Sequence, residues 1–136
     1  MVTPFMKTIV FAHAGTDDRR MYADYLRAHG FHVHEAGTTD AALAAVESCE
    51  MVITGLLIPG SVDGLTLIAR IRANHSSMPI LVVTACSVDT MHHAARLAGC
   101  DELLLKPCFP EDLLDTVWRL LNTPHEHRNM NVAVKQ

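Results

Sequence analysis

Short apolar runs alternate along the chain with longer segments in which apolar residues recur every three or four positions. The runs have the length of β-strands and cover residues 7–12, 31–36, 51–54, 80–84 and 102–105. The longer segments have the periodicity of amphipathic helices and cover residues 16–29, 38–48, 64–73, 88–98 and 110–121. This pattern predicts five strands, each followed by a helix.

Residues suited to helix starts support these boundaries. Thr16 or Asp17 can cap the first predicted helix, and Thr38 or Thr39 can cap the second, because their side-chain oxygens can accept from free N–H groups of the first turn. Pro110 lies where the last helix should begin, a position at which its missing N–H costs nothing. The helices are therefore expected to start close to these residues.

The predicted strands also indicate how the elements are arranged. The runs ILVV (80–83) and LLL (103–105) are apolar at every position, which is typical of strands buried on both faces. Strands of this kind, alternating with helices, predict a doubly wound α/β fold with a parallel sheet between helices. We expect a five-stranded parallel sheet in the flavodoxin-like order 2-1-3-4-5 with five helices.

Composition and length narrow the class of protein. The 136 residues are 49% hydrophobic and 19% charged, with a net charge of −4, which gives no nucleic-acid signal. We expect one domain over residues 1–122, followed by a polar tail or truncated linker over residues 123–136. No apolar run approaches the roughly 18 residues of a membrane span, and the N-terminus lacks a signal-peptide pattern. These features predict a cytoplasmic protein without a membrane or nucleic-acid partner.

Cysteine and histidine positions show no recognisable metal motif. Cys49, Cys86, Cys100 and Cys108 form no CxxC pair, and no Cys/His spacing matches a structural zinc site. We expect the cysteines to be reduced and the nine histidines to be mostly surface residues. The sequence therefore predicts no bound cofactor or metal.

In a doubly wound fold the functional site lies at the carboxyl ends of the central strands. Those ends carry His13-Ala14, Thr54-Gly55, Thr84-Ala85 and Lys106-Pro107. The same strands adjoin the segments IPGSVDGLTLIARIR, MPILVVTA, AGCDELLLKP and FPEDLL, in this order. With these segments, about residues 7–122 resemble the receiver domain of bacterial response regulators.

The resemblance implies a phosphoryl-transfer site of known design. Receiver domains hold Mg²⁺ with an acidic pair after the first strand and accept the phosphoryl group on an aspartate after the third. A hydroxyl after the fourth strand and a lysine after the fifth contact the phosphoryl oxygens. By this resemblance Thr84 is the hydroxyl residue and Lys106 is the lysine, and the Lys106–Pro107 bond is expected to be cis.

The other positions of that design depart from the family. Gly55 stands where the phosphoacceptor aspartate is expected, His13 and Ala14 stand where the acidic pair is expected, and Leu103 replaces an aromatic switch residue. The nearby pair Asp17-Asp18 is an alternative, but using it would shorten the first helix by about a turn. We therefore interpret Asp17 and Asp18 as a solvated helix start. Lys106 then needs other partners, because an unpaired buried charge is costly.

These departures favour a binding module over an enzyme. The hypothesis is a receiver-like domain without Mg²⁺ or phosphorylation that binds a protein partner, such as a histidine kinase or another signalling protein. By resemblance, the face formed by residues 88–122 is a candidate docking or homodimer surface, with Ala94, Leu97, Leu113 and Trp118 as candidate contacts. The alternative is a working phosphorelay receiver with a surrogate acceptor, such as Ser61 or His13, or a different metal site.

Overall fold

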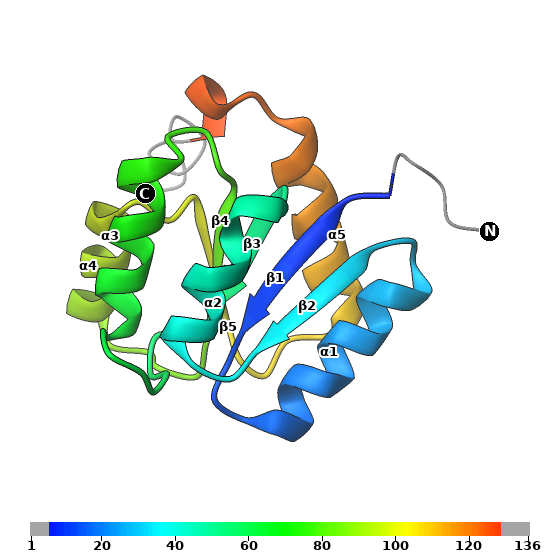
Figure 1. The fold of residues 1–136 in the computed structure, drawn as a ribbon, viewed down its shortest axis with the longest axis horizontal. Helices are drawn as coiled ribbons and strands as arrows, with labels where there is room; N and C mark the ends of the chain where they lie inside the picture. The colour runs from blue at the N-terminus through cyan, green and yellow to red at the C-terminus, as the bar shows by residue number, and fades with distance from the viewer. Residues whose placement is uncertain (1–5, 129–136) are drawn as a thin grey trace.

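The computed structural model describes residues 6–128. The strands are β1 (Thr8–Ala12), β2 (His32–Ala36), β3 (Met51–Thr54), β4 (Ile80–Thr84) and β5 (Glu102–Leu105). The helices are α1 (Thr16–Ala28), α2 (Thr39–Ala45), α3 (Gly64–Asn74), α4 (Asp89–Ala98) and α5 (Pro110–Asn122), and the 3-10 turn η1 (Val46–Ser48) follows α2 (Figure 1). The predicted alternation of strands and helices is confirmed.

All five strands belong to one sheet, in the order β2-β1-β3-β4-β5. Every neighbouring pair is parallel, and Ala12 at the end of β1 lies opposite Ala36 of β2 and Thr54 of β3. The predicted flavodoxin-like order is therefore confirmed. Because the strands are parallel, their carboxyl ends all meet at one edge of the sheet and their amino ends at the other.

The sheet separates two apolar cores. Successive residues of a strand face opposite sides, so Phe11 of β1 lies in the core beneath α1 and α5, and Val10 lies in the core beneath α2, α3 and α4. Figure 1 shows the same division of the helices between the two faces. β3 and β4 are buried along their whole length, which explains their continuous apolar runs.

Two of the three predicted helix starts are confirmed. Thr38 caps α2, since its hydroxyl accepts from the N–H of Ala41 at 3.1 Å, and α5 begins at Pro110. The first helix differs, because Gly15 is the residue before α1 and no side chain caps it. Thr16 is already the first helical residue, so the expected cap at Thr16 or Asp17 is not formed.

The chain does not leave the domain directly after α5. A short helical turn follows Pro124, and Arg128 at its end is only 4% exposed. We expected residues 123–136 to form a polar tail or truncated linker. Its first six residues, 123–128, instead return to the amino edge of the sheet, where Nη2 of Arg128 donates to the Ser77 carbonyl at 2.7 Å. The rest of the predicted tail, residues 129–136, lies outside the described part of the chain.

The candidate contacts on the 88–122 face differ in exposure. Leu113 is fully buried in the core, so it cannot contact a partner. Leu97 is 75% exposed, Ala94 is half-buried, and Trp118 is 44% exposed while its ring packs on Phe31 at a centroid distance of 4.9 Å. Among residues 6–128 no helix has both the length and the apolar character needed to cross a membrane.

Candidate functional site

The residues singled out at the strand ends meet in one small pocket. His13, Gly55, Thr84 and Lys106 all line it, and its volume is about 190 Å³. Backbone hydrogen bonds extend the sheet to these residues: the Gly55 N–H donates to the Ala12 carbonyl at 2.9 Å, and the Lys106 N–H donates to the Thr84 carbonyl at 2.8 Å. The four side-chain positions are therefore set by the parallel pairing of β1, β3, β4 and β5.

Lys106 is the cation of this pocket and has two side-chain partners. Its Nζ lies 2.8 Å from Oδ2 of Asp18 and 2.5 Å from Nε2 of His13. The Lys106 side chain is 12% exposed, while that of Asp18 is 57% exposed. The ammonium group therefore lies inside the pocket, and its counter-charge lies at the rim, where water also reaches it.

Both nitrogens of the His13 ring have hydrogen-bond partners. An ammonium group can only donate, so Nε2 of His13 accepts from Lys106. Nδ1 lies 3.0 Å from the nitrogen of the Gly15 N–H and 3.3 Å from the Gly15 carbonyl oxygen. Burial and the nearby Lys106 charge lower the pKa of His13 below its usual value. Both effects favour the neutral ring that this hydrogen bonding requires.

Asp18 was interpreted as part of a solvated helix start, and the structure corrects this. Its carboxylate forms the ion pair with Lys106, and the hydrogen bond from Lys106 lowers its pKa below the usual range. Asp17, its neighbour, is exposed. In the sequence, the only sign that Asp18 pairs with Lys106 is the acidic charge near the start of α1. Which of the two aspartates faces Lys106 depends on how α1 lies over the sheet.

Gly55 is buried and lies beside the His13 ring. A Cβ atom at position 55 would lie 3.4 Å from Cδ2 of His13 and 3.8 Å from the Val83 carbonyl oxygen, which are ordinary contact distances. The His13 ring therefore lies directly beside the space that a side chain at position 55 would enter. Ala14, the other residue expected at the acidic pair, is exposed and does not line the pocket.

The remaining residues predicted for the site make local contacts in the structure. Thr84 is 6% exposed, and its hydroxyl oxygen accepts from the N–H of Cys86 at 3.1 Å. Leu103 is partly buried and packs against the core beneath α2, α3 and α4. The Lys106–Pro107 bond is cis, as predicted. Ser61, one of the suggested surrogate acceptors, does not line the pocket.

The pocket offers few ligands for a metal ion. Among residues 6–128 no group of three or more His, Cys, Asp or Glu side chains is arranged to hold one. Mg²⁺ binds oxygen ligands in octahedral geometry, whereas this edge presents a histidine nitrogen and one carboxylate that Lys106 already engages. The residues present therefore do not match the oxygen ligands that receiver domains use for Mg²⁺.

Comparison with known proteins identifies the family. A model of the response regulator receiver domain matches residues 16–118, so the chain belongs to this family. Transcriptional regulatory protein SrrA of Staphylococcus aureus is 29% identical over 120 residues, which are 87% of this chain and 47% of SrrA. The chain therefore spans about half the length of the curated relatives that it matches.

Solved structures agree with this assignment. The BeF3-activated receiver domain of RstA from Klebsiella pneumoniae has a TM-score of 0.78 at 27% identity, covering 85% of this chain and 99% of that one. A putative response regulator from Chloroflexus aurantiacus has a TM-score of 0.80 at 28% identity, covering 87% and 99%. A CheY-like receiver domain from Methanospirillum hungatei, at 23% identity and a TM-score of 0.81 over 86% and 94%, shares the fold.

Proposed function

We propose that this receiver domain acts without phosphorylation, as a protein-interaction module in two-component-type signal transduction. In this proposal it is not an enzyme, needs no Mg²⁺ and works in the cytoplasm. Receiver domains of two-component systems interact with signalling proteins such as kinases, and we assign the same type of partner here. The proposal rests on Gly55 and His13, where the chain departs from the family design, and on Lys106, which the chain keeps.

One observation carries the proposal: Lys106 is already bound within the protein. Phosphoryl transfer requires a positioned nucleophile and neutralisation of the charge that develops on the phosphoryl oxygens. Here Gly55 supplies no nucleophile, and the Lys106 ammonium is held by Asp18 and His13. Any phosphoryl group entering the pocket would have to displace these contacts without help from a metal site.

The same contacts disfavour His13 as a surrogate acceptor. A histidine attacks phosphorus through an unprotonated ring nitrogen, and Nε2 is the unprotonated nitrogen of His13 in this arrangement. That nitrogen accepts the hydrogen bond from Lys106, so its lone pair is engaged. The phosphorelay alternative would therefore require the Lys106 side chain to move first.

The 88–122 face supports an interaction role. Val88, Leu97, Leu105, Phe109 and Trp118 are exposed large apolar side chains on α4, β5, α5 and the loops beside them. Large apolar side chains that stay exposed are typical components of protein-binding surfaces. We propose this face, rather than the pocket, as the surface for a protein partner or for a second copy of the domain.

The decisive experiment is phosphorylation with a small-molecule donor. The protein is incubated with acetyl phosphate and Mg²⁺, and in parallel with beryllofluoride, then followed by intact-mass spectrometry and by ¹H–¹⁵N NMR. We expect no mass increase corresponding to a phosphoryl group and no shift of the Thr84 or Lys106 resonances. A stable, Mg²⁺-dependent adduct would refute the proposal.

Two variants separate loss of the acceptor from loss of the metal site. Gly55→Asp restores only the acceptor carboxylate, and its Cβ would lie at ordinary contact distances from His13 and Val83. We expect it to remain unphosphorylated, because His13 and Ala14 still provide no acidic pair. Combining Gly55→Asp with His13→Asp and Ala14→Asp should restore some Mg²⁺-dependent phosphorylation. If Gly55→Asp alone is phosphorylated, the assignment of the acidic-pair positions is wrong.

A further inference from the structure

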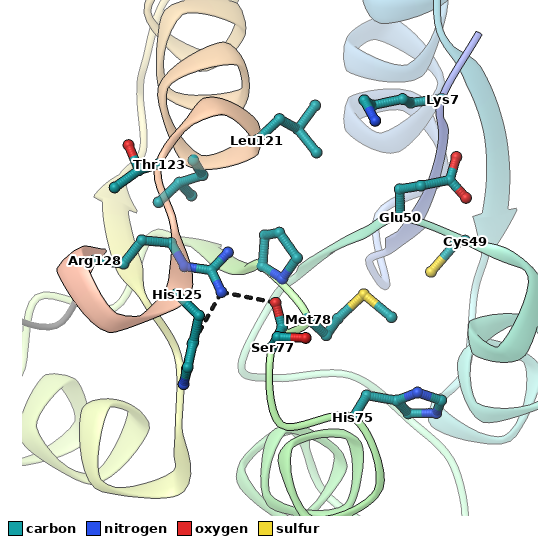
Figure 2. Close-up of a pocket in the computed structure, with 12 residues that line it drawn as sticks. Lys7, Cys49, Glu50, His75, Ser77, Met78, Leu121, Thr123, His125 and Arg128 are labelled. Atoms are coloured by element: carbon teal, nitrogen blue, oxygen red, sulfur yellow. Dashed lines mark hydrogen bonds between the residues drawn. The ribbon is translucent and has the colours of Figure 1, made fainter. Parts of the chain in front are cut away.

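A second hollow lies at the opposite, amino edge of the sheet. Its volume is about 430 Å³, within the range of small-molecule sites. Its walls come from the residues that precede β1, β3 and β4 and from the end of α5 and the turn after it (Figure 2). The proposed interaction role makes no use of this groove, which is distinct from the pocket at Lys106.

A buried carboxylate behind the groove attracts two arginines. Oδ2 of Asp101 accepts from Nη2 of Arg72 at 3.0 Å and from the N–H of Ile80 at 2.8 Å. The second oxygen, Oδ1, lies 3.6 Å from Nε of Arg128, which is too far for a hydrogen bond. Asp101 is 1% exposed, and within residues 6–128 neither Oδ1 nor the Arg128 Nε makes a hydrogen bond. Two guanidinium groups thus share one buried carboxylate, and one oxygen of that carboxylate makes no hydrogen bond within residues 6–128.

Arg128 brings its guanidinium group to the wall of the groove. Its Nη2 donates to the Ser77 carbonyl at 2.7 Å and to Nδ1 of His125 at 2.9 Å, as Figure 2 shows. Both of these acceptors are neutral, and the acidic groups that act on the guanidinium charge are Asp101 and Glu126. Burial lowers the pKa of Arg128, as expected for a cation that lacks full compensation. A buried charge of this kind is stabilised by an anion.

The rest of the groove combines basic and apolar side chains. Lys7 adds a basic group to the wall, and Met78, Leu120 and Leu121 add apolar surface. The His75 ring also lines the wall, with its Nε2 3.0 Å from Oε1 of Glu47. Glu50 is the one carboxylate that lines the groove among the described residues, and its Oε1 accepts from the N–H of Thr8 at 2.8 Å. The lining therefore suits a molecule with an anionic group at one end and an apolar body at the other.

We propose that this groove binds a small organic anion, with its carboxylate or phosphate group beside Arg128 and its apolar body against Met78 and Leu121. A guanidinium group recognises both kinds of anion through charge-assisted hydrogen bonds. Binding would place a negative charge beside the Arg128 guanidinium, whose Nε makes no hydrogen bond within residues 6–128. It would also tie the turn after α5 more firmly to the sheet, because the ligand would contact both.

The test is an NMR titration with four probes. Phenyl phosphate and benzoate carry the two anionic groups on the same ring, benzyl alcohol is their neutral counterpart, and inorganic phosphate lacks the apolar body. We expect saturable shifts of Ser77, Leu121 and the Arg128 Nε–Hε resonance, with an anionic ring compound binding about tenfold more tightly than benzyl alcohol. The ratio between phenyl phosphate and benzoate distinguishes a phosphate from a carboxylate site. Equal affinity for benzyl alcohol and the anions would overturn the proposal, as would shifts confined to Thr84 and Lys106.

Matched variants connect binding to the groove. Arg128→Gln should abolish saturable binding, and Lys7→Gln, at an exposed position on the rim, should weaken it by about threefold. Arg70→Gln makes the same charge change at an exposed residue outside the groove and should leave the affinity unchanged. If Arg128→Gln does not fold, Lys7→Gln against Arg70→Gln still decides the outcome. Equal affinities for these two variants would refute the site.

Discussion

Each edge of the sheet holds basic side chains paired with a carboxylate, but the carboxylates differ in exposure. At the carboxyl edge, Lys106 pairs with Asp18, whose side chain is 57% exposed. At the amino edge, Arg72 and Arg128 share Asp101, which is 1% exposed. The first ion pair faces water on one side, while the carboxylate of the second is closed off by the fold.

This difference in exposure determines at which edge a charged residue can be replaced without loss of the fold. Removing one partner of a surface ion pair costs little, because water replaces it. Removing one partner of a buried pair leaves a charge without solvation, which is strongly destabilising. The carboxyl edge can therefore carry Gly55 and His13 in place of carboxylates while the scaffold stays intact, whereas the amino edge depends on Asp101.

The largest expected effect is that of Asp101→Asn. The change leaves Arg72 and Arg128 without a buried counter-charge and should lower the free energy of unfolding by about 3–5 kcal/mol. Urea unfolding followed by circular dichroism measures this. Asp17→Asn is the matched control at an exposed position and should leave the midpoint unchanged. A small effect of Asp101→Asn would mean that the two edges do not differ as described.

Lys106→Met should have a much smaller effect. Methionine keeps most of the apolar stem of the side chain, and Asp18 can remain hydrated when its partner is removed. We expect the free energy of unfolding to change by less than about 1 kcal/mol in the same assay. A loss as large as that of Asp101→Asn would show that the carboxyl-edge ion pair is as essential as the buried one.

The lowered pKa of His13 predicts a pH effect at the carboxyl edge. As pH falls through the usual value of 6.5, the unfolded chain binds a proton on His13 and the folded chain does not. The free energy of unfolding should therefore fall between neutral pH and about pH 5, and fall less in His13→Gln. Urea midpoints at several pH values for both proteins test this. Parallel pH profiles would contradict the assignment of a depressed pKa to His13.

The smallest effect is expected for Asp18→Asn. Its lowered pKa makes its contribution present above the usual carboxyl pKa and lost as pH falls through the lower folded value. At neutral pH the change should lower the free energy of unfolding by about 0.5 kcal/mol, because the pair is partly exposed. High salt should reduce the difference between the two proteins. A difference that salt leaves unchanged would indicate that the contact is not mainly electrostatic.

Much of the fold and part of the site could be predicted from local patterns. The apolar run of β4 indicated a parallel sheet, and the positions at or directly after the ends of four strands placed His13, Gly55, Thr84 and Lys106 in one pocket. These predictions succeed because side-chain periodicity is a local property and parallel strands bring their ends to a common edge. The expected burial of residues 103–105 on both faces was wrong, because β5 is an edge strand and Leu105 is 44% exposed.

The ion pairs could not be predicted in the same way. Lys106 and Asp18 are 88 positions apart in the chain, and the buried Arg128 lies beside a carboxylate that precedes β5. A position on a helix does not show which residue faces the sheet until the helix is docked. Sequence alone therefore interpreted Asp18 as solvated and residues 123–136 as a tail.

The sequence by itself determined the order of the elements, the parallel sheet and the absence of an acidic side chain at position 55. Only the tertiary structure decided that Lys106 contacts Asp18 and His13, and that Arg128 is buried beside Asp101 at the amino edge. The physical reason is that strands and helices follow from neighbours in the chain, whereas the neutralisation of a buried charge depends on groups that folding brings together.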